Sequence, residues 1–222
     1  MSARLTGDDP DAVRDFIREN TRLLAPPLVP EIKLHLAEES IPLWKKTEEE
    51  LDQMNLPPPY WAFAWAGGQA LARYLLDNVE LCRGKSVLDL GSGSGLTAIA
   101  AAVCGARTVI AADIDRLALC AVGLNAAANG ISVEVRGDDL LGKQPPPVDV
   151  ILVGDLFYER RLGDLVFAFM EAAKVAGTRI LIGDPQRSYF PQGQLTMLAE
   201  YRVPVTRDLE DAEIKRTSVW RF

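Results

Sequence analysis

Three glycines alternate with serines at Gly91, Gly93 and Gly95, directly after the apolar run Ser86–Leu90. Glycine adopts backbone conformations that a side chain forbids, and it lets a ligand approach the main chain closely. Asp89 lies inside the apolar run, where an unpaired carboxylate would be strongly unfavourable. The pattern therefore predicts a strand, a turn that can bind a ligand, and a helix after it.

The G-x-G-x-G spacing distinguishes between two kinds of cofactor loop. A dinucleotide site has G-x-G-x-x-G and holds a pyrophosphate at the helix N-terminus. The carboxylate of Asp89 would repel a pyrophosphate, whereas it would attract a positive amine such as that of S-adenosylmethionine. We therefore expect Asp89, Gly91, Ser92 and Gly93 to bind S-adenosylmethionine, with a plain strand–helix turn as the alternative.

Acidic residues also follow the next three predicted strands. Asp113 is suited to accept both hydroxyls of a ribose, with Ile114 beside it in the same site. Asp138 or Asp139 would accept from an adenine amino group, and we assign this contact to Asp139. Asp155 follows the fourth strand. Because the carboxyl ends of parallel strands meet at one edge, these acids should surround one crevice, although any one of them alone is more often a helix cap or a solvated loop residue.

Aromatic residues gather in residues 60–65, directly before a double glycine. Aromatic faces attract cations such as a sulfonium or an alkylammonium group. We expect Trp65 to lie nearest the cofactor, and Trp61, Phe157 and Tyr158 to form the walls of a pocket for an amine. The structural alternative for the segment is a hydrophobic plug over one edge of the sheet.

Strand and helix patterns alternate from residue 85 onward, which predicts an α/β fold with a Rossmann-like, doubly wound, mostly parallel seven-stranded sheet. In the tail, two strands without a full helix between them predict an antiparallel edge pair. The expected strands span 87–90, 108–112, 131–135, 148–153, 179–182, 201–205 and 218–222, and the expected helices span 96–103, 116–128, 161–175 and about 194–200.

Residues 1–59 are expected to form an N-terminal extension to a cofactor-binding domain at residues 60–222. A helix should begin at residues 8–10 and run through Leu24, because apolar residues recur there at helical spacing. A short strand is expected within 31–38, and a capping box predicts a helix over 47–55.

Composition excludes several function classes. A net charge of −7 disfavours a nucleic-acid partner. Cys82, Cys104 and Cys120 lack metal-site spacing, so we expect buried free thiols and no metal. His35 is the only histidine and alternates with apolar residues, which favours a strand surface position over a catalytic role. Neither a signal peptide nor a membrane span is evident, so we expect a cytoplasmic protein away from membranes. We separately expect a monomer.

The glycine loop, Asp113 and the expected edge pair resemble the class I, seven-strand S-adenosylmethionine-dependent methyltransferases. The sequence Asp155-Leu-Phe-Tyr158 narrows this resemblance to protein-lysine methyltransferases. Together with residues 58–75, it resembles the electron transfer flavoprotein β-subunit lysine methyltransferases, over about residues 30–222. The resemblance implies S-adenosylmethionine as cofactor, the electron transfer flavoprotein β subunit as partner, and Asp155 and Tyr158 as the residues that receive the substrate lysine.

Other functions stay open at this point. They are a methyltransferase for a ribosomal protein or a small-molecule amine, an NAD-binding oxidoreductase domain, and a binding module without activity. Relatives that act on bases or glutamine amides tend to carry Asn-Pro-Pro-Tyr at the end of the fourth strand. The sequence Asp155-Leu-Phe-Tyr158 therefore favours an amine over a planar amide or base.

Overall fold

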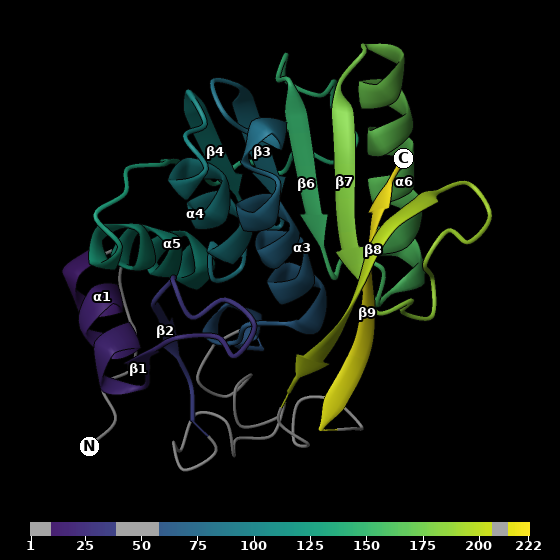
Figure 1. The fold of residues 1–222 in the computed structure, drawn as a ribbon. Coiled ribbons are helices and arrows are strands. Elements are labelled where there is room, and N and C mark those ends of the chain that lie inside the picture. The colour runs from purple at the N-terminus through teal and green to yellow at the C-terminus, as the bar shows by residue number, and fades with distance from the viewer. Residues whose placement is uncertain (1–9, 39–57, 206–212) are drawn as a thin grey trace.

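The computed structural model describes residues 10–38, 58–205 and 213–222, and its main feature is a seven-stranded sheet (Figure 1). The strand order is β5-β4-β3-β6-β7-β9-β8, in which β9 pairs antiparallel with both β7 and β8 and the other pairs are parallel. This confirms the predicted fold class and the edge pair. The strands are β3 (Ser86–Leu90), β4 (Thr108–Ala112), β5 (Glu134–Arg136), β6 (Val150–Gly154), β7 (Arg179–Asp184), β8 (Thr196–Pro204) and β9 (Ile214–Arg221).

The central strands are buried on both faces, which explains why their sequences are continuous apolar runs. Val87 belongs to the core beneath α3 (Ala66–Asp77) and α4 (Leu96–Val103), whereas Leu88 belongs to the core beneath α6 (Arg160–Val175). The alternation follows from the two-residue period of a strand. Helices on both faces therefore leave the carboxyl ends of the strands as the edge where loops can form a site.

The N-terminal segment packs on α5 (Arg116–Ala128). There α1 (Pro10–Glu19) buries Val13 and Ile17 in a cluster that includes residues of α5, close to the 3₁₀ turn η1 (Tyr60–Ala62). The strands β1 (Arg22–Leu24) and β2 (Leu34–Leu36) form a small antiparallel pair.

The expectation that the first helix runs through Leu24 is wrong, because Leu24 lies in β1. The side chains of Asn20 and Thr21 bond back to the carbonyls of Phe16 and Ile17, at 2.8 and 2.6 Å, and α1 ends there. The predicted strand within 31–38 is confirmed as β2, where His35 is half-buried and lies 3.1 Å from the Thr21 hydroxyl. The predicted helix over 47–55 lies outside the described residues.

The helix expected near 194–200 is also wrong. Residues 196–204 form β8, which pairs along its length with β9 and contains a bulge between Met197 and Ala199. The strand expected at 131–135 occupies 134–136 instead, because the amide of Ile131 still bonds to Ala126 O at the end of α5. The predicted helices at 96–103 and 116–128 match α4 and α5.

Cys82 and Cys104 are buried and Cys120 is half-buried, and all three are free thiols. Burial raises the pKa of Cys82 to about 12, which leaves that thiol protonated and unreactive. Within the part of the chain that the structure describes, no helix has the length and apolar character of a membrane span. The same residues contain no group of three or more His, Cys, Asp and Glu side chains arranged to hold a metal. A further 3₁₀ turn, η2 (Val79–Leu81), leads into β3.

Candidate active site

The glycine loop connects β3 to α4, as predicted. Gly91, Gly93 and Gly95 have φ values of 65°, 52° and 79°, in the left-handed region that favours glycine. A Cβ at Gly91 would also lie 2.7 Å from the Leu156 side chain. These positions therefore require glycine, and the loop presents main chain to whatever binds above it.

Asp89 is buried beneath this loop and anchors α4. Its Oδ1 accepts from the Thr97 hydroxyl at 2.6 Å, and its Oδ2 accepts from Ala98 N at 3.1 Å. Burial raises the pKa of Asp89 to about 6. The donors that the sequence required for this carboxylate thus come from the first turn of α4, and a direct contact with a ligand amine stays a prediction.

Asp113 joins the end of β4 to the glycine loop. Its Oδ2 accepts from Gly93 N at 2.8 Å, and its Oδ1 accepts from Asp115 N at 2.9 Å. Ser92 reinforces the junction, because its amide donates to Ala112 O at 3.0 Å. Ile114, directly after Asp113, is 75% exposed and so presents an apolar surface beside the loop.

The two acids after β5 differ in their partners. Asp138 forms ion pairs with Arg136 at 3.0 Å and Lys143 at 3.5 Å. Asp139 is exposed and accepts from Leu141 N at 2.9 Å. Because the charge of Asp138 is compensated by two cations, the geometry favours Asp139 for the predicted contact with an adenine amino group.

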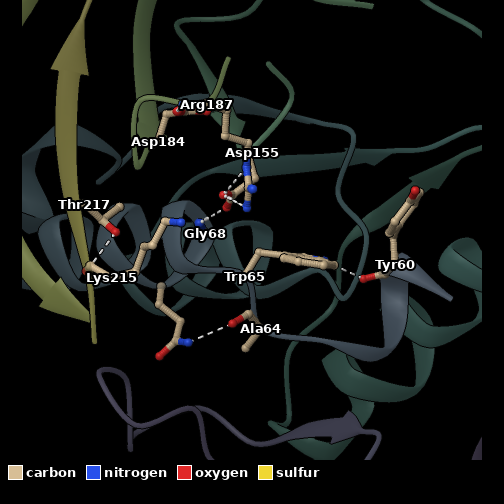
Figure 2. Close-up of polar contacts among 10 residues, drawn as sticks. Tyr60, Ala64, Trp65, Gly68, Asp155, Asp184, Arg187, Lys215 and Thr217 are labelled. Atoms are coloured by element: carbon tan, nitrogen blue, oxygen red, sulfur yellow. Dashed lines mark hydrogen bonds and ion pairs between the residues drawn. The ribbon is translucent and has the colours of Figure 1, made fainter. Parts of the chain in front are cut away.

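Asp155 is buried at the end of β6 with a left-handed φ of 58°. Its Oδ2 accepts from Gly68 N at 2.8 Å, while its Oδ1 accepts from Arg187 Nε and Nη2 at 3.0 and 2.7 Å (Figure 2). The carboxylate is therefore fixed between the N-terminus of α3 and the loop after β7. The sequence offered no motif for Arg187, which lies 32 residues from Asp155.

The double glycine brings α3 into contact with β7. A Cβ on Gly67 would lie 2.2 Å from Gly183 O and 2.5 Å from Asp155 Oδ2. A Cβ on Gly183 would lie 2.1 Å from Gly67 O. This close approach is what lets Gly68 N reach the carboxylate.

Asp184, at the end of β7, was not predicted as a site residue, because the sequence prediction placed site acids only after the first four strands. It is fully buried, and its Oδ1 accepts from Arg187 N at 2.7 Å. Its Oδ2 has no hydrogen-bond partner among the described residues. Burial and the neighbouring carboxylate of Asp155 raise the pKa of Asp184 to about 7.

These raised values make stability depend on pH. In the folded state, burial raises the pKa values of Asp89 and Asp115 to about 6 and that of Asp184 to about 7, well above the ordinary value of 3.8. Between pH 4 and 8 the folded state therefore binds more protons than the unfolded state, so the free energy of unfolding falls as pH rises. Urea unfolding should show wild type more stable at pH 5 than at pH 8, and Asp184→Asn should reduce this difference. Asp164→Asn, on the exposed side of α6, is the control, and a slope unchanged in Asp184→Asn would contradict the assignment.

Tyr60, Trp65 and Tyr158 form an aromatic group that is joined to Asp155 through Arg187, the partner of its carboxylate. The Tyr60 ring lies 6.0 Å from the Trp65 ring and 5.7 Å from the Tyr158 ring, between centroids. Trp65 Nε1 donates to Tyr60 O at 2.9 Å, and Arg187 lies 5.5 Å from the Trp65 centroid (Figure 2). Tyr60 and Tyr158 are 49% and 46% exposed, so both rings are accessible to a ligand.

Two expected pocket walls are corrected by the structure. Trp61 is buried in the cluster formed with α1 and α5. Phe157 is fully buried and packs edge-on against Phe190, at 5.6 Å between centroids. Trp61 and Phe157 each face the core, whereas their sequence neighbours Tyr60 and Tyr158 face outward and are exposed. Aromatic type alone could not distinguish them.

Comparisons with known proteins agree with this geometry. The ribosomal protein L11 methyltransferase (PrmA) family matches residues 69–181, half of the chain. The electron transfer flavoprotein beta subunit lysine methyltransferase of Rattus norvegicus is 40% identical over 217 residues, which cover 95% of this chain and 84% of that protein. The Homo sapiens protein of the same name is 38% identical, over 96% and 83% of the two chains.

Solved structures show the same fold. Ribosomal protein L11 methylase from Lactobacillus delbrueckii subsp. bulgaricus superposes with a TM-score of 0.50 at 22% identity, over 69% of this chain and 77% of that one. TrmN from Thermus thermophilus gives 0.50 at 24% identity, over 67% and 47%. With the relatives' similarity extending over nearly the whole sequence, the chain is a methyltransferase and belongs to the family of electron transfer flavoprotein beta subunit lysine methyltransferases.

Proposed function

We propose that this methyltransferase transfers a methyl group from S-adenosylmethionine to the ε-amine of lysine residues in the electron transfer flavoprotein β subunit. The observation that carries the proposal is the carboxylate of Asp155, held on its two oxygens by Gly68 N and Arg187, together with the rings of Trp65, Tyr60 and Tyr158, a group that Arg187 joins through Trp65. A carboxylate next to aromatic faces suits an alkylamine.

The described residues fit S-adenosylmethionine. A Cβ at Gly93 would have only the Trp61 Cα nearby, at 4.0 Å, so the main chain there is open to a ligand. We assign Asp113 to the ribose hydroxyls, Asp139 and Ile114 to the adenine, and Trp65 and Asp155 to the sulfonium end. The remaining residues assigned to the methionine end are Asp89, Gly91, Ser92 and Gly93. When bound, the cofactor supplies an electrophilic methyl group on a positively charged sulfur.

The residues of the chain must orient a neutral lysine amine. Deprotonating a lysine with a pKa near 10.4 at pH 7 costs roughly 4–5 kcal/mol. The rings of Tyr60, Trp65 and Tyr158 would exclude water and so lower that pKa. Asp155 would orient the amine toward the methyl group, and alignment of the reacting atoms would supply much of the remaining acceleration.

Cofactor affinity tests the ribose assignment. Asp113→Ala removes charged hydrogen bonds to the ribose, and the loss of one such bond, roughly 1.5–3 kcal/mol, should already raise Kd for S-adenosylmethionine roughly 10- to 100-fold by calorimetry. Asp149→Ala is the matched control, because Asp149 also accepts from a backbone amide, that of Ser86, but at the opposite ends of the strands. Equal affinity of Asp113→Ala and wild type would contradict the assignment.

The substrate test uses purified proteins and a labelled methyl donor. Mass spectrometry should find methylated lysine in the electron transfer flavoprotein β subunit. Ribosomal protein L11 is the second candidate, because the L11 methyltransferase family matches half of the chain. Methylation of L11 alone would replace the first candidate by the second, and label entering only RNA would contradict a protein substrate.

Three further expectations belong to the same proposal. The net charge of −7 supports a partner other than nucleic acid. We also propose a cytoplasmic monomer, and a division between an N-terminal extension at 1–59 and the methyltransferase domain at 60–222. Light scattering of the purified protein tests the oligomeric state, since the mass of a dimer would contradict a monomer.

A further inference from the structure

Residues 28–37 are bound through their main chain to η1, α3 and α5. In the described part of the chain, four of their backbone amides donate to these elements, and three of the four acceptors are side-chain amides. The bonds are Leu28 N to Gln69 Oε1 at 3.2 Å, Lys33 N to Asn129 Oδ1 at 2.9 Å, His35 N to Asn125 Oδ1 at 2.7 Å and Ala37 N to Ala62 O at 2.9 Å. β2 is thereby held against α5 (Figure 1).

Asn125 connects this segment to the glycine loop. While its Oδ1 accepts from His35 N, its Nδ2 donates to Ser94 O at 2.8 Å. An asparagine amide supplies both an acceptor and a donor, which an ionised carboxylate cannot do. The residue is fully buried in α5, so a ligand above the loop would touch the loop and not this side chain. Asn125 therefore acts on the loop through Ser94.

The glycine loop is thereby held from two sides. On one side Asp113 Oδ2 accepts from Gly93 N at 2.8 Å, and on the other Asn125 donates to the next residue, Ser94. Gly93 has a φ of 52°, and glycine leaves such a conformation easily because no side chain restricts it. The main chain assigned to the cofactor therefore keeps its shape through contacts made by neighbouring elements.

Resting on the proposed function, we propose that Asn125 is a positioning residue for S-adenosylmethionine. It holds the glycine loop in the conformation that receives the cofactor, and β2 supports it from the other side. β2 thus belongs to the cofactor site, although it lies before the domain boundary proposed at residue 60. Apparent affinity falls with the fraction of molecules whose loop is in the receptive conformation, so a loosened loop weakens binding without altering the chemistry.

The first test is the affinity of Asn125→Ala for S-adenosylmethionine, measured by calorimetry. The variant loses both hydrogen bonds of the buried amide, so Kd should rise roughly 5- to 50-fold, the range that corresponds to losing one buried hydrogen bond. With the cofactor saturating, kcat for the protein substrate should stay within about twofold of wild type, because the residue acts on binding alone.

Asn129→Ala is the matched control. Asn129 bonds to the same segment one helical turn later, at Lys33 N and Lys33 O, at 2.9 and 2.6 Å, and makes no hydrogen bond to the glycine loop among the described residues. Thermal unfolding should show both variants less stable than wild type, whereas only Asn125→Ala should bind the cofactor more weakly. An equal rise of Kd in both variants, or an unchanged Kd in Asn125→Ala, would overturn the inference.

A second measurement needs no variant. Coupling between two sites is reciprocal, so a cofactor that fixes the loop should also strengthen the bond between Asn125 and His35 N. When S-adenosylmethionine is added to wild type, hydrogen exchange followed by NMR should therefore slow more at the amide of His35 than at that of Lys33. Equal slowing at the two amides would overturn the inference, even if Asn125→Ala did not fold.

Failure of the proposed function gives a different result. If wild type did not bind S-adenosylmethionine, the cofactor assignment and this inference would be rejected together. If wild type bound the cofactor and methylated lysine while Asn125→Ala kept the wild-type Kd, only this inference would be rejected.

Discussion

Asp155→Asn is expected to lower kcat for methyl transfer by roughly 10²–10⁴-fold, the range found when a group that acts on the reacting atoms is removed. The asparagine amide has the same shape as the carboxylate, but it lacks the negative charge that holds Arg187. One of the two acceptor oxygens is also replaced by a nitrogen that can only donate. S-adenosylmethionine affinity should stay within a few-fold of wild type, since the glycine loop and Asp113 are unchanged. Single-turnover kinetics with labelled cofactor measures both quantities.

A matched control distinguishes chemistry from folding. Asp149→Asn alters a carboxylate that also accepts from a backbone amide, at the amino ends of the strands, and should keep wild-type turnover. Thermal unfolding of both variants reports any general loss of structure. Normal turnover by Asp155→Asn would remove this carboxylate from the mechanism.

Gly67→Ala is expected to damage both stability and activity. The added Cβ would lie 2.2 Å from Gly183 O and 2.5 Å from Asp155 Oδ2, so α3 must move away from β7. Overpacking of this kind costs about 1–3 kcal/mol, which lowers the unfolding midpoint by roughly 2–12 °C. Because the movement also displaces the carboxylate and Gly68 N, methyl transfer should fall more than stability alone explains.

Gly123→Ala provides the comparison for this variant. Gly123 lies on the exposed side of α5 with nothing within 4 Å of an added Cβ, so alanine should stabilise the helix by about 0.5–1 kcal/mol. Calorimetry and initial rates on both variants give the result. If the two variants unfolded at the same temperature and transferred methyl groups at the same rate, the close contact at Gly67 would be important neither for stability nor for activity.

The sequence predicted best where glycine and periodicity coincide. The helices α4 and α5 match because Gly95 and Gly130 mark a start and an end within apolar repeats. The first part of β8 was predicted as a helix because β8 lies at the sheet edge, where exposed and buried positions do not alternate cleanly, whereas the antiparallel edge pair itself was predicted correctly. The identity of β8 as a strand depends on pairing with β9, a contact that no local pattern reports.

Site residues with a local sequence signal were likewise predicted, whereas those that depend on long-range contacts were not. Asp113 and Asp155 were found because an acid after a buried strand is a local signal, and the structure places both at the carboxyl ends of strands. Arg187 and Asp184 were missed because their role depends on the loop after β7 returning to Asp155. Phe157 was misassigned because only the three-dimensional turn decides which aromatic residue faces the core.

A crystal structure of the complex with S-adenosylhomocysteine and a lysine-containing peptide of the substrate tests the central claim most directly. The account predicts the ribose hydroxyls on Asp113 and the glycine loop along the amino-acid end of the ligand. It also predicts the lysine nitrogen at the carboxylate of Asp155, near the rings of Tyr60, Trp65 and Tyr158. A ligand bound away from the carboxyl ends of β3, β4 and β6, or a lysine that does not approach Asp155, would contradict it.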